Sequence, residues 1–164
     1  MEPQEIQWAP RPATADDFPQ MLAIETQVHL LAPWTERHFK EEMEKPYSQI
    51  LVMTDEETDE IVGGYLVSRL LFDEIEILNV AVALPYRSLG LAKRLIRAVV
   101  GVGARKSAKR AILDVRKSNL PAIQLYHGLG FEIQQVRKGF YSNGEDAYSM
   151  RMELIDPIRD SGVF

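Results

Sequence analysis

The stretch from residue 78 to residue 92 constrains the fold most, because it joins a strand to a helix through a very short turn. Apart from Asn79, residues 78–83 are apolar, and the two valines alternate with alanines, which predicts a buried strand. Pro85 has no backbone N–H to give to a sheet, so the strand ends before it. Beyond Gly90, apolar side chains recur at helical spacing, which predicts a helix directly after the turn.

The turn at residues 87–92 predicts a site for an anion. The first N–H groups of a helix have no helical partner, and the helix dipole places partial positive charge beside them. Gly90 and Ala92 are small enough for a diphosphate to approach the backbone, and Arg87 adds a fixed charge. The same pattern also fits ordinary turn chemistry. The Gly-x-Gly-x-x-Gly pattern of a dinucleotide-binding fold is absent here, which disfavours that fold.

Length and composition predict a single domain over residues 1–156, with a frayed tail at residues 157–164. No apolar run approaches the roughly 20 residues of a membrane span, and the N-terminus has no signal core, so we expect a cytoplasmic protein without membrane attachment. The chain has no cysteine, which excludes disulfides, thiol nucleophiles and zinc–thiolate sites. The histidines lack metal-ligand spacing, so no metal is expected. The chain has 24 acidic and 19 basic residues, and this negative net charge disfavours direct nucleic-acid binding.

The hydrophobic pattern predicts an α/β (α+β) fold in the order strand, two helices, three strands, helix, strand, helix, two strands. The first strand is expected at an edge, over residues 5–11, broken by Pro10 and Pro12. The three successive strands with tight turns should be antiparallel, whereas helical crossovers favour parallel neighbours for the strand at residues 110–115. A mixed, largely antiparallel sheet of about six to seven strands with helices on both faces follows.

Two side chains in the second half of the chain are candidates for proton transfer. Asp114 lies in an otherwise apolar strand, which is unusual for a carboxylate. It is either a structural partner of Arg116 or a cap, or a base that takes a proton from an incoming amine, directly or through water. Tyr126, on the following helix, is either a core tyrosine with a satisfied hydroxyl or a proton donor to a leaving thiolate. The residue pattern alone leaves these alternatives open.

Together these features resemble the GNAT superfamily of acyl-CoA N-acetyltransferases over nearly the whole chain. Within it, the chain looks like the RimI-type enzymes that acetylate the N-terminal amine of a small-subunit ribosomal protein. The resemblance is carried by Leu78-Asn79-Val80-Ala81-Val82, Arg87-Ser88-Leu89-Gly90-Leu91-Ala92, Leu113-Asp114-Val115-Arg116 with Ser118-Asn119, Leu125-Tyr126, Leu129-Gly130-Phe131, Pro33-Trp34, and Lys138-Gly139-Phe140-Tyr141 with Gly144-Glu145-Asp146-Ala147. One position departs from the pattern: Asp114 stands where those enzymes have Glu. Its shorter side chain favours a bridging water over direct proton abstraction.

The resemblance implies acetyl-CoA as co-substrate, a protein N-terminus as acceptor and no metal. Asp114 would receive the proton of the amine, and Tyr126 would protonate the departing thiolate. The residues that it implies for acetyl-CoA are Val80, Ala81, Val82, Arg87, Ser88, Leu89, Gly90, Leu91, Ala92 and Asn119, and those for the peptide are Pro33, Trp34, Phe140 and Tyr141. Two alternatives stay open: a GNAT enzyme acting on lysine or a small-molecule amine, and a non-catalytic domain that binds acyl-CoA.

Overall fold

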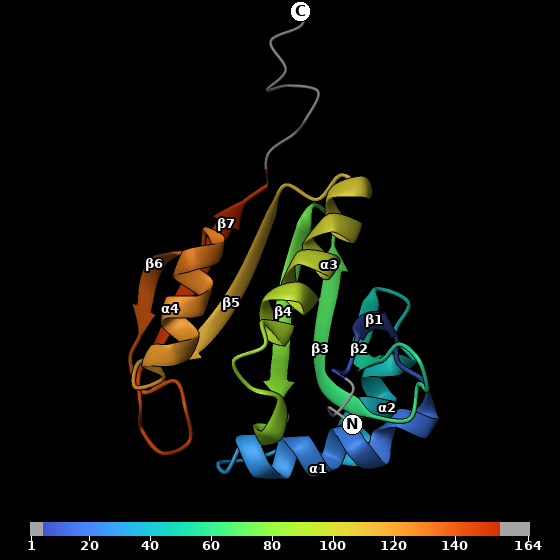
Figure 1. Cartoon of the computed structure of the whole chain (residues 1–164). Coiled ribbons are helices and arrows are strands. Elements are labelled where there is room, and N and C mark those ends of the chain that lie inside the picture. The colour runs from blue at the N-terminus through green and yellow to red at the C-terminus, as the bar shows by residue number, and fades with distance from the viewer. Residues whose placement is uncertain (1–4, 155–164) are drawn as a thin grey trace, which may run out of the picture. The chain divides into compact units, whose positions relative to one another are not determined.

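Figure 1 shows a computed structural model of the chain, in which residues 5–154 are described. The strands are β1 (Trp8–Pro12), β2 (Ser48–Asp55), β3 (Val62–Leu71), β4 (Glu74–Val82), β5 (Arg110–Arg116), β6 (Glu132–Arg137) and β7 (Ala147–Glu153). The helices are α1 (Phe18–Val28), α2 (Glu36–Met43), α3 (Leu91–Arg105) and α4 (Leu120–Leu129), with short 3-10 turns at Ala15–Asp17 and Leu84–Tyr86. The predicted order of elements is confirmed.

The strands form one seven-stranded sheet in the order β1-β2-β3-β4-β5-β7-β6. β4 and β5 are parallel, whereas the pairs β1–β2, β5–β7 and β6–β7 are antiparallel. The predicted mixed, largely antiparallel sheet is therefore confirmed. The prediction for the first strand was wrong in two respects, because β1 begins at Trp8 instead of residue 5, and it continues through Pro10 and ends at Pro12 instead of being broken at Pro10. An edge strand tolerates proline, since a missing N–H on its open side removes no ladder bond.

The chain divides into two compact units. The first unit contains residues up to Ser68 together with Asn79–Val99, and the second contains Arg69–Leu78 together with the residues from Val100 onward. The single domain over residues 1–156 stays a prediction, and the tail at residues 157–164 lies outside the described residues. No helix within residues 5–154 is both long and apolar enough to cross a membrane.

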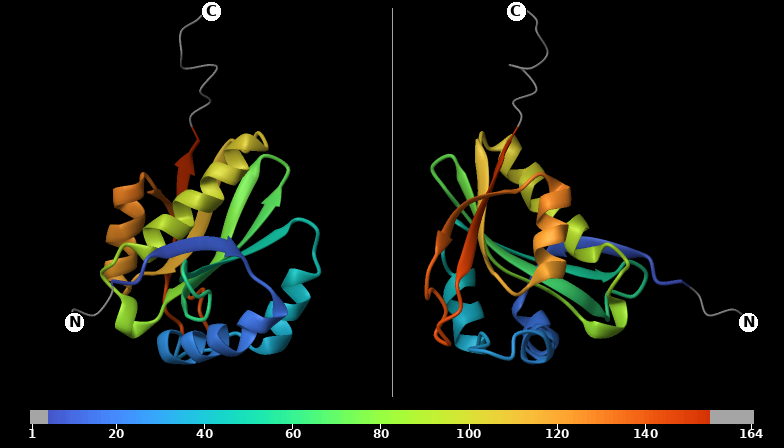
Figure 2. Two further views of the ribbon diagram at one scale, coloured as in Figure 1. Left: turned by 45° about the vertical axis from the view of Figure 1, so that its right-hand side comes forward. Right: turned by 90° about the vertical axis from the view of Figure 1, so that its left-hand side faces the viewer.

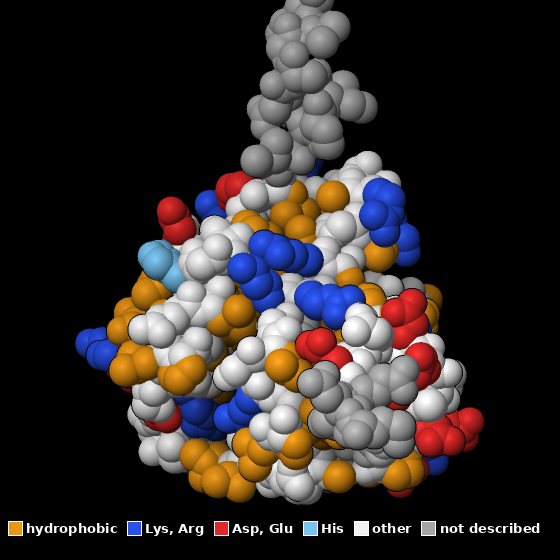
Figure 3. All heavy atoms as spheres, viewed as in Figure 1, with side chains coloured by type: hydrophobic (Ala, Val, Ile, Leu, Met, Phe, Trp, Pro, Cys, Tyr) orange, Lys and Arg blue, Asp and Glu red, His pale blue; other side chains and the backbone are white. Residues whose placement is uncertain are grey.

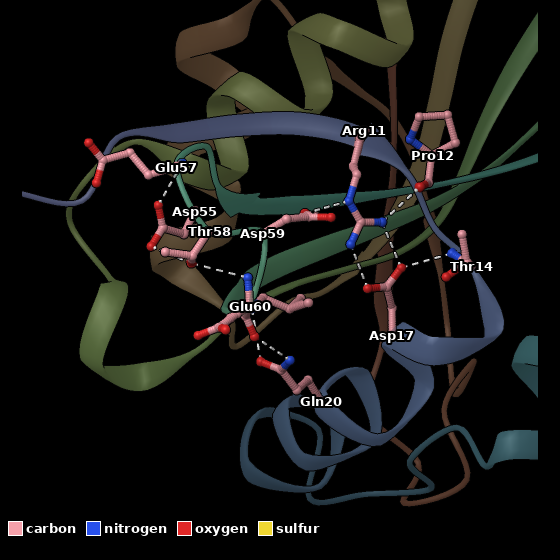
Figure 4. A network of polar contacts seen from close by, with 11 residues as sticks. Arg11, Pro12, Thr14, Asp17, Gln20, Asp55, Glu57, Thr58, Asp59 and Glu60 are labelled. Atoms are coloured by element: carbon pink, nitrogen blue, oxygen red, sulfur yellow. Dashed lines mark hydrogen bonds and ion pairs between the residues drawn. The ribbon is translucent and has the colours of Figure 1, made fainter.

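An ion-pair network holds the first unit together around Arg11 at the end of β1 (Figure 4). The Arg11 guanidinium donates two hydrogen bonds of 2.8 Å to the carboxylate of Asp17 and one of 2.7 Å to Asp59. Asp17 also accepts the backbone N–H of Thr14 at 2.8 Å, which caps the start of the helical segment. This bidentate arrangement ties β1, the start of α1 and the turn between β2 and β3 together.

In the second unit, helix α4 covers one face of strands β5, β7 and β6, as both views of Figure 2 and Figure 1 show. Asn119 caps the start of α4 by accepting the N–H of Ala122 at 3.3 Å. Gly130 ends the helix with a φ of 108°, a left-handed conformation that glycine adopts without strain. The core of this unit includes the fully buried side chains Ile75, Ala111, Phe131 and Met150.

Candidate active site

The loop between β4 and α3 presents a run of unpaired backbone amides, as the sequence predicted. Within residues 5–154 no group accepts a hydrogen bond from the backbone N–H groups of residues 88–93, which we call the open amide run. The first bond at the start of α3 runs from the N–H of Arg94 to the carbonyl of Gly90, at 3.1 Å. Ser88 and Gly90 have φ values of 64° and 75°, and a Cβ at Gly90 would meet nothing within 4 Å. The amides therefore open onto accessible space, which suits an anion.

Positive side chains surround the open amide run. Figure 3 shows Lys and Arg side chains gathered over α3. Arg87 is exposed at the start of the loop, and Lys93 and Arg97 follow in the first turns of the helix. None of these three cations forms an ion pair with any residue that the structure describes. Their charge is therefore available to an anionic ligand.

The end of β4 keeps an unpaired edge. The ladder between β4 and β5 runs from Glu74↔Arg110 to Ile77↔Leu113, and no described residue of β5 pairs with residues 78–82. Along this stretch Asn79 and Ala81 are buried, while Val80 and Val82 are half-buried. Backbone groups on such an edge can pair with an extended ligand in the manner of an added strand.

The sequence analysis missed a buried carboxylate, Glu25, which is only 1% exposed. Glu25 accepts the backbone N–H of Trp34 at 2.9 Å, the side-chain amide of Asn79 at 3.0 Å and the hydroxyl of Tyr65. A carboxyl group buried this deeply needs hydrogen-bond partners, and here three are present. The cluster joins α1, the loop between α1 and α2, β3 and the end of β4. The signal was the position of Glu25 on the otherwise apolar stripe of α1.

Pro33 and Trp34 lie half-buried in the loop between α1 and α2. The Trp34 ring packs against Phe39, with 5.2 Å between the ring centroids, and its backbone is held by Glu25. The Trp34 ring therefore packs inside the first unit, while part of its surface stays open. Leu30 and Leu31, just before it, are exposed.

Asp114 in β5 is exposed, and its carboxylate is already engaged. It accepts the hydroxyl of Ser149, which stands opposite it on β7, and lies 3.5 Å from the guanidinium of Arg137 on β6. Its ion-pair partner is thus Arg137, not Arg116. Arg116 instead lies 3.4 Å from Glu145.

Tyr126 in α4 is only 7% exposed, and burial raises the pKa of its hydroxyl to about 12. In the described part of the chain no group hydrogen-bonds this hydroxyl, although its ring packs on Phe131 at 6.0 Å between centroids. The hydroxyl oxygen is not among the buried polar atoms without a partner, so it reaches solvent and is open to a ligand. Asn119 at the start of the same helix uses its side-chain oxygen for the cap, which leaves its amide nitrogen available to a ligand.

Phe140 and Tyr141 lie in the loop between β6 and β7, with their rings edge to face at 5.1 Å between centroids. The Arg116 guanidinium lies 3.9 Å from the centre of the Tyr141 ring, which fixes this aromatic pair to the end of β5. Burial raises the pKa of the Tyr141 hydroxyl, against the opposing effect of Arg116. Phe140 stays exposed. The pair therefore offers an apolar surface on a fixed support.

The predicted site residues fall into two groups. The first unit holds the open amide run with Arg87, the edge of β4 at residues 80–82, and Pro33 with Trp34. The second unit holds Asp114, Asn119, Tyr126, Phe140 and Tyr141. The first group suits the binding of an extended, diphosphate-bearing ligand, and the second contains the candidates for proton transfer.

Comparison with known proteins defines the class. The family model described as the acetyltransferase (GNAT) family matches residues 12–131, so the chain belongs to this family and is an acetyltransferase. The resemblance found in the sequence is thereby confirmed.

Three relatives illustrate the likeness. A Bacillus subtilis protein named as a candidate ribosomal protein bS18-alanine N-acetyltransferase is 36% identical over 137 residues, which is 82% of this chain and 88% of the relative. The Escherichia coli enzyme of that name is 26% identical over 141 residues, or 84% and 92%. Its crystal structure matches with a TM-score of 0.80 over 90% of this chain and 94% of that one, at 25% identity. Ard1 from Thermoplasma volcanium matches with a TM-score of 0.81 over 90% and 98%, also at 25% identity.

Proposed function

We propose that this protein transfers the acetyl group of acetyl-CoA to the N-terminal α-amine of a protein. The observation that carries the proposal is the open amide run, which suits the diphosphate of a coenzyme and lies in a chain of the acetyltransferase family. Two relatives carry the name ribosomal protein bS18-alanine N-acetyltransferase, the first of them as a candidate. We therefore infer a small-subunit ribosomal protein with an N-terminal alanine as the acceptor.

Acetyl-CoA binding is proposed along the first unit. The diphosphate accepts hydrogen bonds from the open amide run, and Arg87 adds a charge-assisted contact. The pantetheine arm pairs with the edge of β4 at residues 80–82, and a backbone N–H near Val80 polarises the thioester carbonyl. The amide nitrogen of Asn119 is proposed as a further donor to the arm. No protein nucleophile is needed, because the amine attacks the thioester directly.

The chemical step needs one proton acceptor and one hydrogen-bond donor. An α-amine has a pKa near 8, so it loses its proton more readily at neutral pH than a lysine side chain does. Asp114 is the acceptor that the resemblance implies. Because Ser149 and Arg137 already engage its carboxylate, we propose that any transfer to it passes through a water molecule. Tyr126 holds its proton at neutral pH and donates it toward the departing thiolate.

Two aromatic surfaces, one in each unit, are each proposed to contact the peptide, as the resemblance implies. Trp34 with Pro33 in the first unit, and Phe140 with Tyr141 in the second, keep part of their rings accessible on supports that hydrogen bonds and ring contacts hold in place. Aromatic walls with few rotatable bonds grip a small first side chain at little entropic cost.

A peptide panel tests the proposal. Peptides that begin with alanine are offered with a free or a blocked α-amine, each with an internal lysine, and coenzyme A release is followed with a thiol reagent. The chain contains no cysteine, so the reagent reports the coenzyme thiol alone. We expect turnover that blocking the α-amine abolishes. Turnover that persists on the blocked peptide would assign the enzyme to lysine, and no turnover with retained coenzyme A binding would indicate a non-catalytic binding domain.

A further inference from the structure

One hydrogen bond holds the middle of the loop between α1 and α2, which carries the proposed peptide contact at Trp34. Among the residues that the structure describes, residues 30–34 form a single hydrogen bond, from the backbone N–H of Trp34 to Oε1 of Glu25 at 2.9 Å. Ala32 has a left-handed φ of 54°, and Leu30 is 79% exposed, so neither favours this loop conformation by itself. Apart from the packing of the Trp34 ring, the loop therefore depends on Glu25.

The two oxygens of the Glu25 side chain serve different elements. Oε1 accepts the Trp34 N–H from the loop, whereas Oε2 accepts the side-chain amide of Asn79 at 3.0 Å. Oε2 also accepts the hydroxyl of Tyr65 on β3. Glu25 is buried, so bulk water does not stand in for these donors. Because a carboxyl group is planar and rigid, the contact that fixes one oxygen also fixes the other, and the loop is tied to the end of β4.

This tie ends at the strand that carries the proposed thioester contact. Asn79 immediately precedes residues 80–82, the unpaired edge proposed for the pantetheine arm. A ligand that pairs with this edge restrains the backbone on which Asn79 lies. Asn79 in turn sets the orientation of Glu25, and Glu25 sets the position of the Trp34 backbone. All of these residues belong to the first unit. An occupied edge therefore favours one conformation of the loop.

We propose that Glu25 is a positioning residue that aligns the loop between α1 and α2 with the thioester edge of β4. This inference rests on the proposed function and concerns how that site places the peptide. Glu25 touches neither the amine nor the thioester, and it acts through Trp34 on one side and Asn79 on the other. Binding of coenzyme A and binding of the peptide then favour each other, because both stabilise the same orientation of one carboxyl group. Asp114 keeps its proposed role as the proton acceptor.

The test measures peptide affinity and turnover of the full-length Glu25→Met variant, which keeps the length of the side chain and loses both oxygens. The probe is a peptide that begins with alanine and carries a fluorophore at its C-terminus, titrated by anisotropy with and without saturating coenzyme A. The wild type should bind this peptide at least about fivefold more tightly when coenzyme A is present. In Glu25→Met this ratio should fall below about two, and the KM of the peptide should rise about tenfold, as for the loss of one hydrogen bond. The kcat at saturating peptide and the dissociation constant of acetyl-CoA should stay within about twofold of the wild type, because the lost contact aids binding and not the chemical step.

Two further variants separate positioning from stability. Tyr65→Phe removes a donor from the same carboxyl group but leaves the loop and β4 tied, so the ratio and the peptide KM should keep their wild-type values while the thermal midpoint falls. Asn79→Leu cuts the tie to β4 alone, so the peptide should bind as in the wild type without coenzyme A, and the ratio should fall below about two. Asn79→Leu also carries the test if Glu25→Met does not fold.

The outcomes distinguish this inference from the proposed function. A wild-type ratio near one, unchanged ratios in Glu25→Met and Asn79→Leu, or a fall in thermal midpoint as their sole effect would overturn the role of Glu25 and leave the proposed function standing. Absence of turnover by the wild type on every free N-terminus would overturn both.

Discussion

Replacing Tyr126 with phenylalanine isolates the contribution of a single oxygen atom. A hydroxyl with a pKa of about 12 is almost fully protonated at neutral pH. Full transfer to a thiolate, whose conjugate thiol has a pKa of about 8.5, is uphill by roughly 3.5 units, or about 5 kcal/mol. The hydroxyl therefore acts in the transition state chiefly as a hydrogen-bond donor to the developing charge. A hydrogen bond to a charged group contributes about 1.5–3 kcal/mol, which corresponds to a fall in kcat of roughly 10- to 150-fold.

The assay follows coenzyme A release at saturating acetyl-CoA between pH 6 and 9.5. Because the hydroxyl has no hydrogen-bond partner within residues 5–154, Tyr126→Phe should change the free energy of unfolding by less than about 0.5 kcal/mol. With the pKa near 12, ionisation of Tyr126 should cause no fall in wild-type kcat across this range. Tyr148→Phe, a half-buried tyrosine on β7, is the matched control. A kcat for Tyr126→Phe within threefold of wild type, or a loss confined to the KM of acetyl-CoA, would refute the reasoning.

Three further outcomes are expected. Asp17→Asn should lower the free energy of unfolding in urea by about 3 kcal/mol, because it breaks the paired, buried carboxylate at Arg11. Burial raises the pKa of Asp17, but the hydrogen bonds from Arg11 and from the Thr14 N–H outweigh burial, so the pKa is lowered overall. The stabilisation by Asp17 in the wild type is therefore fully present above the pKa of the unfolded state, near 3.9, and is lost as the pH falls through the lower pKa of the folded state. Arg87→Ala should weaken acetyl-CoA binding about tenfold by calorimetry, with kcat at saturation unchanged. Phe72→Gly should raise the thermal midpoint, because Phe72 has a left-handed φ of 56° and glycine removes the backbone strain of about 1 kcal/mol. Phe72 is fully exposed, so the change loses no buried surface. A lower midpoint would contradict this reasoning.

Residues that begin or end helices and strands made much of the fold predictable. Pro85 and Gly90 mark the strand–turn–helix at the proposed diphosphate site within a few residues of each other, and Asn119 and Gly130 mark the two ends of α4. Each of these residues acts through its own backbone geometry, which a sequence reveals directly. The open amide run follows from the same local rules, because any helix start leaves its first N–H groups unpaired.

Contacts between side chains on different strands could not be predicted from such local patterns. Glu25 accepts hydrogen bonds from residues 40 and 54 positions further along the chain, so its place on the apolar stripe of α1 predicts a buried carboxyl group but not its partners. Asp114 meets Ser149 and Arg137 because the register of β5, β7 and β6 brings them together, whereas the sequence suggested Arg116, two positions away on the same strand. Register depends on the packing of the whole sheet, and it decides which charges meet.

The open amide run also bears on how long the protein survives in a cell. Without a ligand, the loop keeps Ser88 in a left-handed conformation, and its series of donors has no acceptor among residues 5–154. A ligand that binds only the folded chain adds about 2.7 kcal/mol to its stability when present at one hundred times its dissociation constant. If acetyl-CoA is that ligand, starvation would both slow the reaction and expose the enzyme to proteolysis, so that metabolic supply would set its abundance as well as its rate.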